Sequence, residues 1–188
     1  MILIIGKGCL GTALSNALPD CAVIGRPEFD LTSQADCDAI VKQYPLPDVV
    51  INTVGVIADN LWASMLVNFV APSYITMKYV QTLDKGHIIN ISSASAWWPS
   101  HPGLSLTRFT YNISKESLSK FSQHINRVYV NDNRDLVITN VEPGAFQSSM
   151  SNYSGMEIDK IVNVVKFAIE QKVQQVSLIK NNVSIQTN

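Results

Sequence analysis

Tyr111 and Lys115 lie four residues apart in "TYNISKES", a segment expected to form the first turns of a helix. Side chains at that spacing share one face of a helix, so the phenol and the ammonium group are expected to be neighbours. A nearby cation stabilises a phenolate and lowers the pKa of the phenol, so such a pair can transfer a proton. The competing interpretation is structural, because a lysine at a helix end can extend to solvent while its alkyl stem packs.

The helix that carries the pair is expected from about Tyr111 to Val130. One stripe of this helix is formed by Tyr111, Lys115, Leu118, Ser122 and Ile125. The two polar residues therefore occupy the N-terminal end of a face that is otherwise buried. The elements around them decide between chemistry and packing.

The composition indicates a single domain. Of the 188 residues, 46% are hydrophobic and 15% charged, which is enough for the chain to bury its own core. Lys and Arg total 14 against 15 Asp and Glu without a run of either sign, so we expect no nucleic-acid or membrane partner. The cysteines have no metal-ligand spacing, and "MILIIG" is neither a basic leader nor a membrane span. We therefore expect a cytoplasmic protein with reduced thiols and no metal.

Short apolar runs alternate with helical segments along the chain. The expected strands cover residues 1–5, 21–25, a brief 28–32, 48–55, 87–93, 136–144 and 175–180, and the expected helices cover 9–19, 33–44, 61–83, 111–130 and 157–171. This alternation predicts an α/β fold, a Rossmann-type doubly wound and mostly parallel sheet. Ligands of such sheets bind beyond the carboxyl ends of the strands.

A glycine-rich turn, "GKGCLG", follows the first strand and precedes the first helix. Its glycines Gly6, Gly8 and Gly11 have the GxGxxG spacing, which allows a tight turn and lets backbone approach a pyrophosphate at the helix N-terminus. Three glycines in a loop can also be turn residues only. Because the motif stands between a strand and a helix, we interpret it as a dinucleotide site.

The end of the second strand carries Arg26. An arginine there can pair with the 2′-phosphate of NADP, so the sequence favours NADP(H) over NAD(H). Lys7 either adds a second positive charge or is only solvated. Asp30 either caps a turn before the helix that Thr32 or Ser33 begins, or bonds the adenine amine, with Leu31 against the ring.

Polar residues also mark later elements. Asn52 ends one strand, where it most simply ties neighbouring strands together, and Ser92 and Ser93 end the next. Asn68 stands four residues before Pro72, which has no N–H to offer the carbonyl of residue 68. That carbonyl either bonds a water in a cleft or marks an ordinary proline kink.

Seven short elements occur in order: "GKGCLG", "DLT", "NTVG", "VNFVAP", "HIINISS", "YNISK" and "VEPGAFQSS". Together they resemble the short-chain dehydrogenase/reductase superfamily over nearly the whole chain, with "YNISK" standing as its Tyr-x-x-x-Lys motif. The resemblance implies hydride transfer between a nicotinamide cofactor and a small carbonyl or alcohol substrate. It also implies a homodimer or homotetramer that pairs through residues 61–83 and 110–130.

The resemblance assigns roles to residues of this chain. Tyr111 is the expected general acid or base, and Lys115 the cation that lowers its pKa and bonds the nicotinamide ribose. Ser93 is expected to bond the substrate oxygen, and Asn68 to hold a water that relays protons to Lys115. The expected cofactor contacts are Gly6, Lys7, Gly8, Cys9, Leu10, Gly11, Arg26, Asp30, Leu31, Thr53, Val54, Gly55, Tyr111, Lys115, Pro143, Gly144 and Ser148.

The chain also departs from the family pattern. A helix is missing between the second strand and "DLT", so one face of the sheet is expected to be thinly covered. This compressed first part of the chain also resembles the nucleotide-sugar reductases. The gap from Ser93 to Tyr111 is long, which keeps Ser95 as an alternative to Ser93. That gap also contains Trp97, Trp98 and His101. These residues are expected either to line a substrate pocket, to cover a dimer surface or to form a hydrophobic lid. Because the substrate loop after "VEPG" is short, a non-catalytic dinucleotide-binding regulatory protein is the alternative function.

Overall fold

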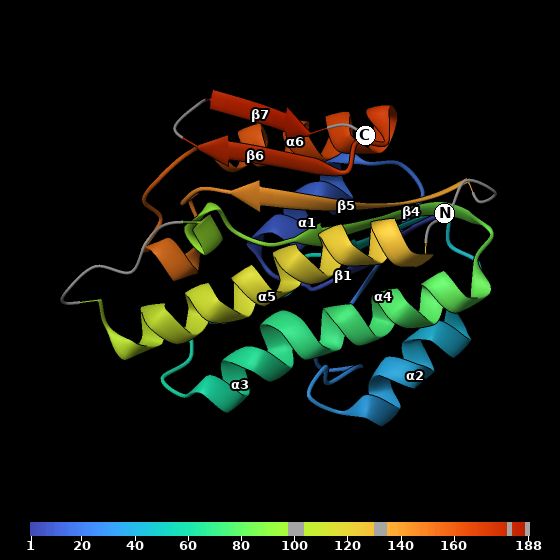
Figure 1. The fold of residues 1–188 in the computed structure, drawn as a ribbon, viewed down its shortest axis with the longest axis horizontal. Coiled ribbons are helices and arrows are strands. Elements are labelled where there is room, and N and C mark those ends of the chain that lie inside the picture. The colour runs from blue at the N-terminus through green and yellow to red at the C-terminus, as the bar shows by residue number, and fades with distance from the viewer. Residues whose placement is uncertain (98–103, 130–134, 180–181, 187–188) are drawn as a thin grey trace.

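The computed structural model describes residues 1–97, 104–129, 135–179 and 182–186. These residues form one seven-stranded sheet with the strand order β2-β1-β3-β4-β5-β6-β7 (Figure 1). The strands β1 to β6 run parallel to their neighbours, and β7 runs antiparallel to β6. The α/β class and the mostly parallel sheet are thus confirmed.

The strands are β1 (Ile2–Ile5), β2 (Cys21–Ile24), β3 (Val49–Asn52), β4 (Lys85–Ile91), β5 (Asp135–Pro143), β6 (Gln175–Ile179) and β7 (Asn182–Gln186). The helices are α1 (Cys9–Ala17), α2 (Gln34–Gln43), α3 (Leu61–Met65), the π-helical η1 (Leu66–Val70), α4 (Ala71–Thr82), α5 (Leu106–Tyr129) and α6 (Ile158–Gln171), with 3₁₀ turns at η2 (Ala94–Trp97) and η3 (Ser149–Ser151). Each helix expected from the sequence is present.

Apolar strands form this sheet because helices cover both of its faces. In β1, Leu3 and Ile5 point into one core and Ile4 into the other, and all three are fully buried. The first core also holds Ile40 of α2, Ile75 and Tyr79 of α4, and Ile125 of α5. The second holds Leu14 of α1, and Ile161 and Val165 of α6. The sheet is therefore a rigid platform buried from both sides.

The two faces differ in their helical cover. Figure 1 shows α2, α4 and α5 together on one face, where α4 contacts both of the others, while α1 packs against α6 on the opposite face. Among the described elements, no helix follows β2 before the turn that leads to α2. The face of α1 and α6 is thus the thinly covered one that the sequence predicts.

The expected brief strand over residues 28–32 is wrong, because these residues form turns. The backbone N–H groups of Glu28 and Phe29 donate to the Gly25 carbonyl at 3.0 and 3.1 Å, which folds the chain back directly after β2. The Asp30 carboxylate then accepts from the Thr32 backbone N–H at 3.0 Å. Since these groups are bonded within the turn, they do not pair with a strand.

The start of α5 and the C-terminal end of the sheet also differ from the sequence prediction. The helix α5 begins at Leu106 rather than near Tyr111, and the Ser105 hydroxyl accepts from the Arg108 backbone N–H at 3.3 Å at its start. The C-terminal strand predicted from the sequence, β6, pairs antiparallel with a further strand, β7, with Val176 opposite Ile185. The alternation of apolar residues in "NVSIQ" was the signal for this edge strand.

The strand order reverses at β1, which lies between β2 and β3. The connection after β1 runs through α1 on one face of the sheet, whereas the connection after β3 runs through α3 and α4 on the other face. The two connections therefore diverge above the carboxyl ends of β1 and β3. Such a switch point leaves the crevice in which α/β sheets bind ligands.

Candidate active site

A cavity of about 490 Å³ lies at this edge of the sheet. Its wall consists of the glycine turn after β1, the turn after β2, the loop after β3, the end of β4, the first turns of α5 and the segment after β5. This volume is typical of sites for small organic ligands. Of the predicted site residues, all line the cavity except Gly11 and Asn68.

The glycine turn packs through two of its glycines and leaves space at the third. A Cβ on Gly11 would lie 1.8 Å from the Gly6 carbonyl oxygen, and Gly6 itself has a φ of +123° that other residues rarely adopt. A Cβ on Gly8, by contrast, would meet nothing within 4 Å. Gly8 caps α1 without a side-chain hydrogen bond, so no side chain at the cap occupies the N–H groups of the first turn. This arrangement fits a dinucleotide pyrophosphate, which binds a helix N-terminus through such groups.

Lys115 is buried, with its side chain facing the cavity from α5. Its Nζ donates to the Val54 carbonyl at 3.0 Å and to the Ile91 carbonyl at 2.8 Å. It forms no ion pair among the described residues, and burial lowers its pKa from 10.5 to about 7. Lys115 therefore joins the loop after β3, the end of β4 and α5 at one point, and it does not extend to solvent.

Tyr111 lies one turn before Lys115 and is half-buried in the same cavity. Burial raises the pKa of Tyr111 above its usual value, while a hydrogen bond with Ser93 and the charge of Arg108 act in the opposite direction. The sequence argument expected Lys115 to bring this pKa down toward neutrality. In the structure burial dominates, so the net shift of the Tyr111 pKa is upward. The cation that lowers this pKa is Arg108 rather than Lys115, whose amine is held by two carbonyls.

Arg108 was not identified from the sequence. Arg108 lines the cavity three residues before Tyr111, a spacing that makes the two side chains neighbours on the helix. The three-residue spacing of Arg108 and Tyr111 could have indicated that they are neighbours, but only if α5 was expected to begin at Leu106. With the helix expected from Tyr111, residue 108 belonged to a loop.

The serines at the end of β4 have different surroundings. The Ser92 hydroxyl bonds the Lys115 carbonyl at 2.6 Å and the Ser119 hydroxyl at 2.7 Å, which fixes α5 against the sheet. The Ser93 hydroxyl instead reaches both Tyr111 and the Ser95 hydroxyl, the latter at 2.8 Å. Ser93 and Ser95 both line the cavity, and Ser93 is the one beside the phenol.

Asn68 is fully buried in the π-helical turn η1 rather than in the cavity wall. Its side-chain oxygen accepts from the Val56 N–H at 2.7 Å, and its nitrogen donates to the Val56 carbonyl and the Ser114 hydroxyl, both at 2.9 Å. In this widened turn, the Ala71 backbone N–H donates to the carbonyl of Leu66, five residues earlier. Asn68 thus ties the loop after β3 to α5, a role carried by its side chain and not considered from the sequence.

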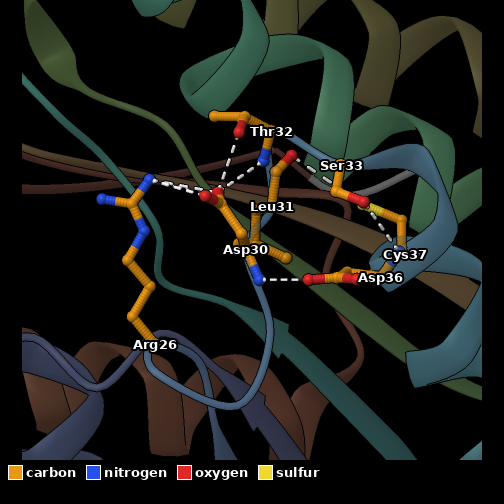
Figure 2. A network of polar contacts seen from close by, with 7 residues as sticks. All are labelled: Arg26, Asp30, Leu31, Thr32, Ser33, Asp36 and Cys37. Carbon is orange, nitrogen blue, oxygen red and sulfur yellow. Dashed lines mark hydrogen bonds and ion pairs between the residues drawn. The ribbon is translucent and has the colours of Figure 1, made fainter.

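The opposite end of the cavity carries two ion pairs. Arg26 contacts Asp30 at 3.0 Å, and Lys7 contacts Glu28 at 2.5 Å (Figure 2 shows the first pair). The Asp30 carboxylate also accepts from the Thr32 N–H and hydroxyl, and these bonds together with Arg26 lower its pKa to about 2. Asp30 therefore stays ionised and caps its turn, as its structural interpretation predicts.

The turn around Asp30 is joined to α2 by a second set of contacts. Ser33 is the N-cap of α2 and accepts from the Asp36 N–H at 3.2 Å, while the Asp36 carboxylate accepts from the Asp30 N–H (Figure 2). Leu31 lines the cavity from the same turn. The backbone between β2 and α2 is therefore held firmly, and it presents Arg26 and Leu31 to the cavity.

The segment after β5 forms the remaining wall. The Gly144 N–H donates to the Leu178 carbonyl at 2.8 Å, which places Pro143 and Gly144 against β6. Ser148 begins the 3₁₀ turn η3, where its N–H and the Ser151 hydroxyl bond at 3.2 Å. The short loop is thus a compact structure that lines the cavity with serines.

Other polar residues singled out in the sequence are structural. The Asn52 side chain donates to the Asn90 side-chain oxygen at 2.7 Å, so it ties β3 to β4 as its simpler interpretation predicts. Trp97 packs its ring beneath the Lys120 ammonium, 4.5 Å from the ring centre. Trp98 and His101 lie outside the described residues.

The described residues contain no cluster of three or more side chains suited to hold a metal ion. In the same part of the chain, no helix has the length and hydrophobicity needed to cross a membrane.

Comparison with protein-family models and with curated protein sequences finds no match. The structure, however, is similar to solved dehydrogenases. A short-chain dehydrogenase from Sphingobium yanoikuyae in complex with NADPH superimposes with a TM-score of 0.77 at 17% identity, over 94% of this chain and 86% of its own. A short-chain dehydrogenase from Burkholderia cenocepacia in complex with NADP gives 0.78 at 16% identity, over 94% and 86%.

A third structure, a bulky-bulky ketone specific alcohol dehydrogenase from Comamonas testosteroni, gives a TM-score of 0.78 at 17% identity, over 94% of this chain and 84% of its own. At these identities the likeness establishes the fold. The chain therefore has the Rossmann-like fold of the short-chain dehydrogenases over nearly its whole length.

The buried Lys115 predicts a specific pH dependence of stability. Its folded pKa of about 7 lies below the unfolded value of 10.5, so above pH 7 the unfolded state binds the extra proton and the folded state becomes relatively more stable as pH rises. Lys115→Met removes this term. Between pH 7 and 8.5 the free energy of unfolding of wild type, minus that of the variant, should rise by up to about 1.4 kcal/mol per pH unit. Urea unfolding at several pH values measures it, and a flat difference would show that Lys115 is not desolvated.

The glycine turn predicts opposite outcomes for two neighbouring substitutions. Gly11→Ala places a methyl group against the Gly6 carbonyl and should lower the free energy of unfolding by about 1–3 kcal/mol. The added methyl group of Gly8→Ala meets open space, so this substitution should lower the free energy of unfolding by less than about 1 kcal/mol. The same methyl group occupies the space expected for the pyrophosphate, so it should weaken NADPH binding. Thermal unfolding with and without NADPH compares them. Unchanged NADPH binding by a well-folded Gly8→Ala would contradict a pyrophosphate at this turn.

Proposed function

We propose that the protein is a short-chain dehydrogenase/reductase that interconverts a carbonyl and an alcohol with NADP(H). The observation that carries this proposal is that Tyr111, Ser93 and Lys115 meet in the cavity that begins at the glycine turn. Phenol, hydroxyl and amine come from two elements, the end of β4 and the start of α5, that the sheet holds in place. A ligand that spans the cavity reaches both the turn and this group.

The chain's residues fit a dinucleotide along the cavity. The turn around Gly8 and the start of α1 would hold the pyrophosphate, and Val54, Gly55, Pro143 and Gly144 of the cavity wall would flank the nicotinamide. Lys115 lies next to Gly55, with its Nζ 3.4 Å from where a Cβ of that residue would be, and would bond the nicotinamide ribose. When bound there, the cofactor supplies or accepts the hydride.

Tyr111 would act as the proton donor in reduction. Its raised pKa keeps the phenol protonated at neutral pH, which is the form that a general acid needs. The Ser93 hydroxyl, which lines the cavity beside Tyr111, would orient the carbonyl oxygen between the two groups. In oxidation the same phenol, once deprotonated, would accept the proton of the alcohol.

Lys115 and Asn68 would complete the proton path. Lys115 has a pKa of about 7 and can both release and take up a proton near neutral pH. Asn68 holds the Val56 backbone through two hydrogen bonds, and its own carbonyl lacks the N–H that residue 72 would offer in a regular helix. A water on that carbonyl would connect Lys115 to solvent.

Arg26 would select NADP(H). It is an exposed cation at the cavity end that lies opposite Tyr111, and it is held toward Asp30. A 2′-phosphate carries more charge than one carboxylate, and it can bind the planar guanidinium through two of its nitrogens at once. Two of the similar structures were described in complex with NADPH or NADP.

A second copy of the chain would cover the apolar surface of α3 and α5. These helices contact each other, and Leu61, Trp62, Phe109 and Ile113 are exposed on them. Contiguous apolar surface of this kind is typical of interfaces. We therefore propose a homodimer, or a homotetramer built from it, that pairs through these helices.

Tyr111→Phe tests the reaction directly. Loss of the proton donor should lower kcat for NADPH-dependent reduction of a panel of aldehydes and ketones by about 10²–10⁴-fold, with little change in NADPH affinity. Tyr153→Phe, an exposed tyrosine outside the cavity, is the matched control. An unchanged rate in Tyr111→Phe contradicts the assignment. NADPH binding without turnover by wild type would instead support the regulatory alternative.

Arg26→Ala tests the choice of cofactor. It should raise the Kd for NADPH by about 10- to 100-fold, because a charge-assisted hydrogen bond is lost and Asp30 is left unpaired, while the Kd for NADH stays unchanged. Arg127→Ala, an exposed arginine near the end of α5, controls for net charge. Fluorescence titration of the reduced cofactors gives both constants, and an equal loss for both would show that Arg26 does not read the 2′-phosphate.

A further inference from the structure

We propose that the substrate is an oxo acid whose carboxylate binds Arg108, one helical turn from the carbonyl that Tyr111 protonates. This inference rests on the proposed function and deepens it by naming the class of substrate. It depends on the position of Arg108, on the charges of the cavity wall and on the polar groups around it.

Arg108 stands at the substrate end of the cavity. It belongs to the first turn of α5, is exposed, and lines the same cavity as Tyr111 and Ser93. Its guanidinium is near enough to the Tyr111 hydroxyl to pull the pKa of that group downward. A ligand that reaches Tyr111 through its carbonyl oxygen therefore lies within reach of Arg108.

Arg108 differs from the other cations of the cavity wall. Lys7 is paired with Glu28, Arg26 with Asp30, and Lys115 donates to two carbonyls. The Arg108 side chain has no hydrogen bond or ion pair with any residue in the described parts of the chain. A guanidinium that faces a ligand cavity without a protein partner is positioned for an anion from the ligand.

No carboxylate of the described wall competes for that position. Asp30 is the one acidic residue among the described lining residues, and it is bound to Arg26 and Thr32 at the other end of the cavity. The start of a long helix adds a positive potential beside Arg108. The substrate end of the cavity therefore carries a net positive potential.

A carboxylate matches this site better than a phosphate monoester does. One guanidinium balances a single negative charge and can bind both carboxylate oxygens at once. A phosphate monoester would bring about −1.5 to −2 charges, leaving an excess beside the phenol that must donate a proton. The hydroxyls of Ser95 and Ser149 also line the cavity and can donate to the carboxylate.

The helix geometry sets the length of the substrate. Three residues of helix span ~4.5 Å, so with the reach of both side chains the carboxylate carbon lies roughly 5–8 Å from the carbonyl carbon. Aldehydes and ketones with the acid on the far side of a short chain or a ring have this spacing. 4-Formylbenzoate and 6-oxoheptanoate are suitable probes, each compared with its neutral methyl ester.

The experiment measures kcat/KM for each acid and its methyl ester with NADPH, in wild type, Arg108→Gln, Arg108→Lys and Arg127→Gln. Wild type should prefer at least one acid over its ester by about 10- to 100-fold. Arg108→Gln should abolish that preference mainly through KM, Arg108→Lys should restore part of it, and Arg127→Gln should retain it. The ratio of acid to ester cancels any general effect of Arg108 on Tyr111.

Two outcomes overturn the inference while leaving the reductase function intact. One is turnover of the esters as efficiently as the acids by wild type, and the other is an acid preference that survives in Arg108→Gln. A separate titration of the NADP⁺-loaded protein with terephthalate, by calorimetry, needs no turnover. If no carbonyl is reduced, the proposed function fails. In that case, terephthalate binding that depends on Arg108 still supports an anion site at this residue. If terephthalate does not bind either, the anion site is overturned as well.

Discussion

The buried amine of Lys115 is the contact on which the rest of the site depends. Its hydrogen bonds to the Val54 and Ile91 carbonyls join the loop after β3, the end of β4 and α5 at one point. Because an unpartnered buried amine is costly, these elements cannot separate without leaving it exposed or unbonded. Tyr111 is one turn away on the same rigid helix, so its position relative to Ser93 follows from this contact.

The electrostatics of the cavity divide it into two ends. At the β2 end, cations are paired with carboxylates on the surface, where a ligand phosphate can compete for Arg26. At the α5 end, burial lowers the pKa of Lys115 to about 7 and raises the pKa of Tyr111, while Arg108 lines the cavity beside them. The site therefore combines a protonated phenol with a guanidinium that has no partner among the described residues, an arrangement that fits the proposed reduction of a negatively charged carbonyl compound.

Much of this arrangement could be predicted from the sequence, because it depends on local spacing. Gly6, Gly8 and Gly11 indicate the turn, and the spacing of Tyr111 and Lys115 places both on one helical face. Long-range contacts could not be predicted. The bond of Asn68 to Val56, the carbonyl partners of Lys115 and the pairing of β7 depend on segments that meet only in the fold. Arg108 was missed because a capping serine, Ser105, begins α5 earlier than the apolar stripe indicates.

A crystal structure of the protein with NADPH would test the central claim most directly. We expect the pyrophosphate at Gly8 and the start of α1, the 2′-phosphate beside Arg26, and the nicotinamide between the Val54–Gly55 loop and Pro143. In that position the C4 atom of the ring should lie next to the space bounded by Tyr111 and Ser93. A nicotinamide that turns away from Tyr111, or a cofactor bound elsewhere on the sheet, would contradict the assignment of this cavity as the active site.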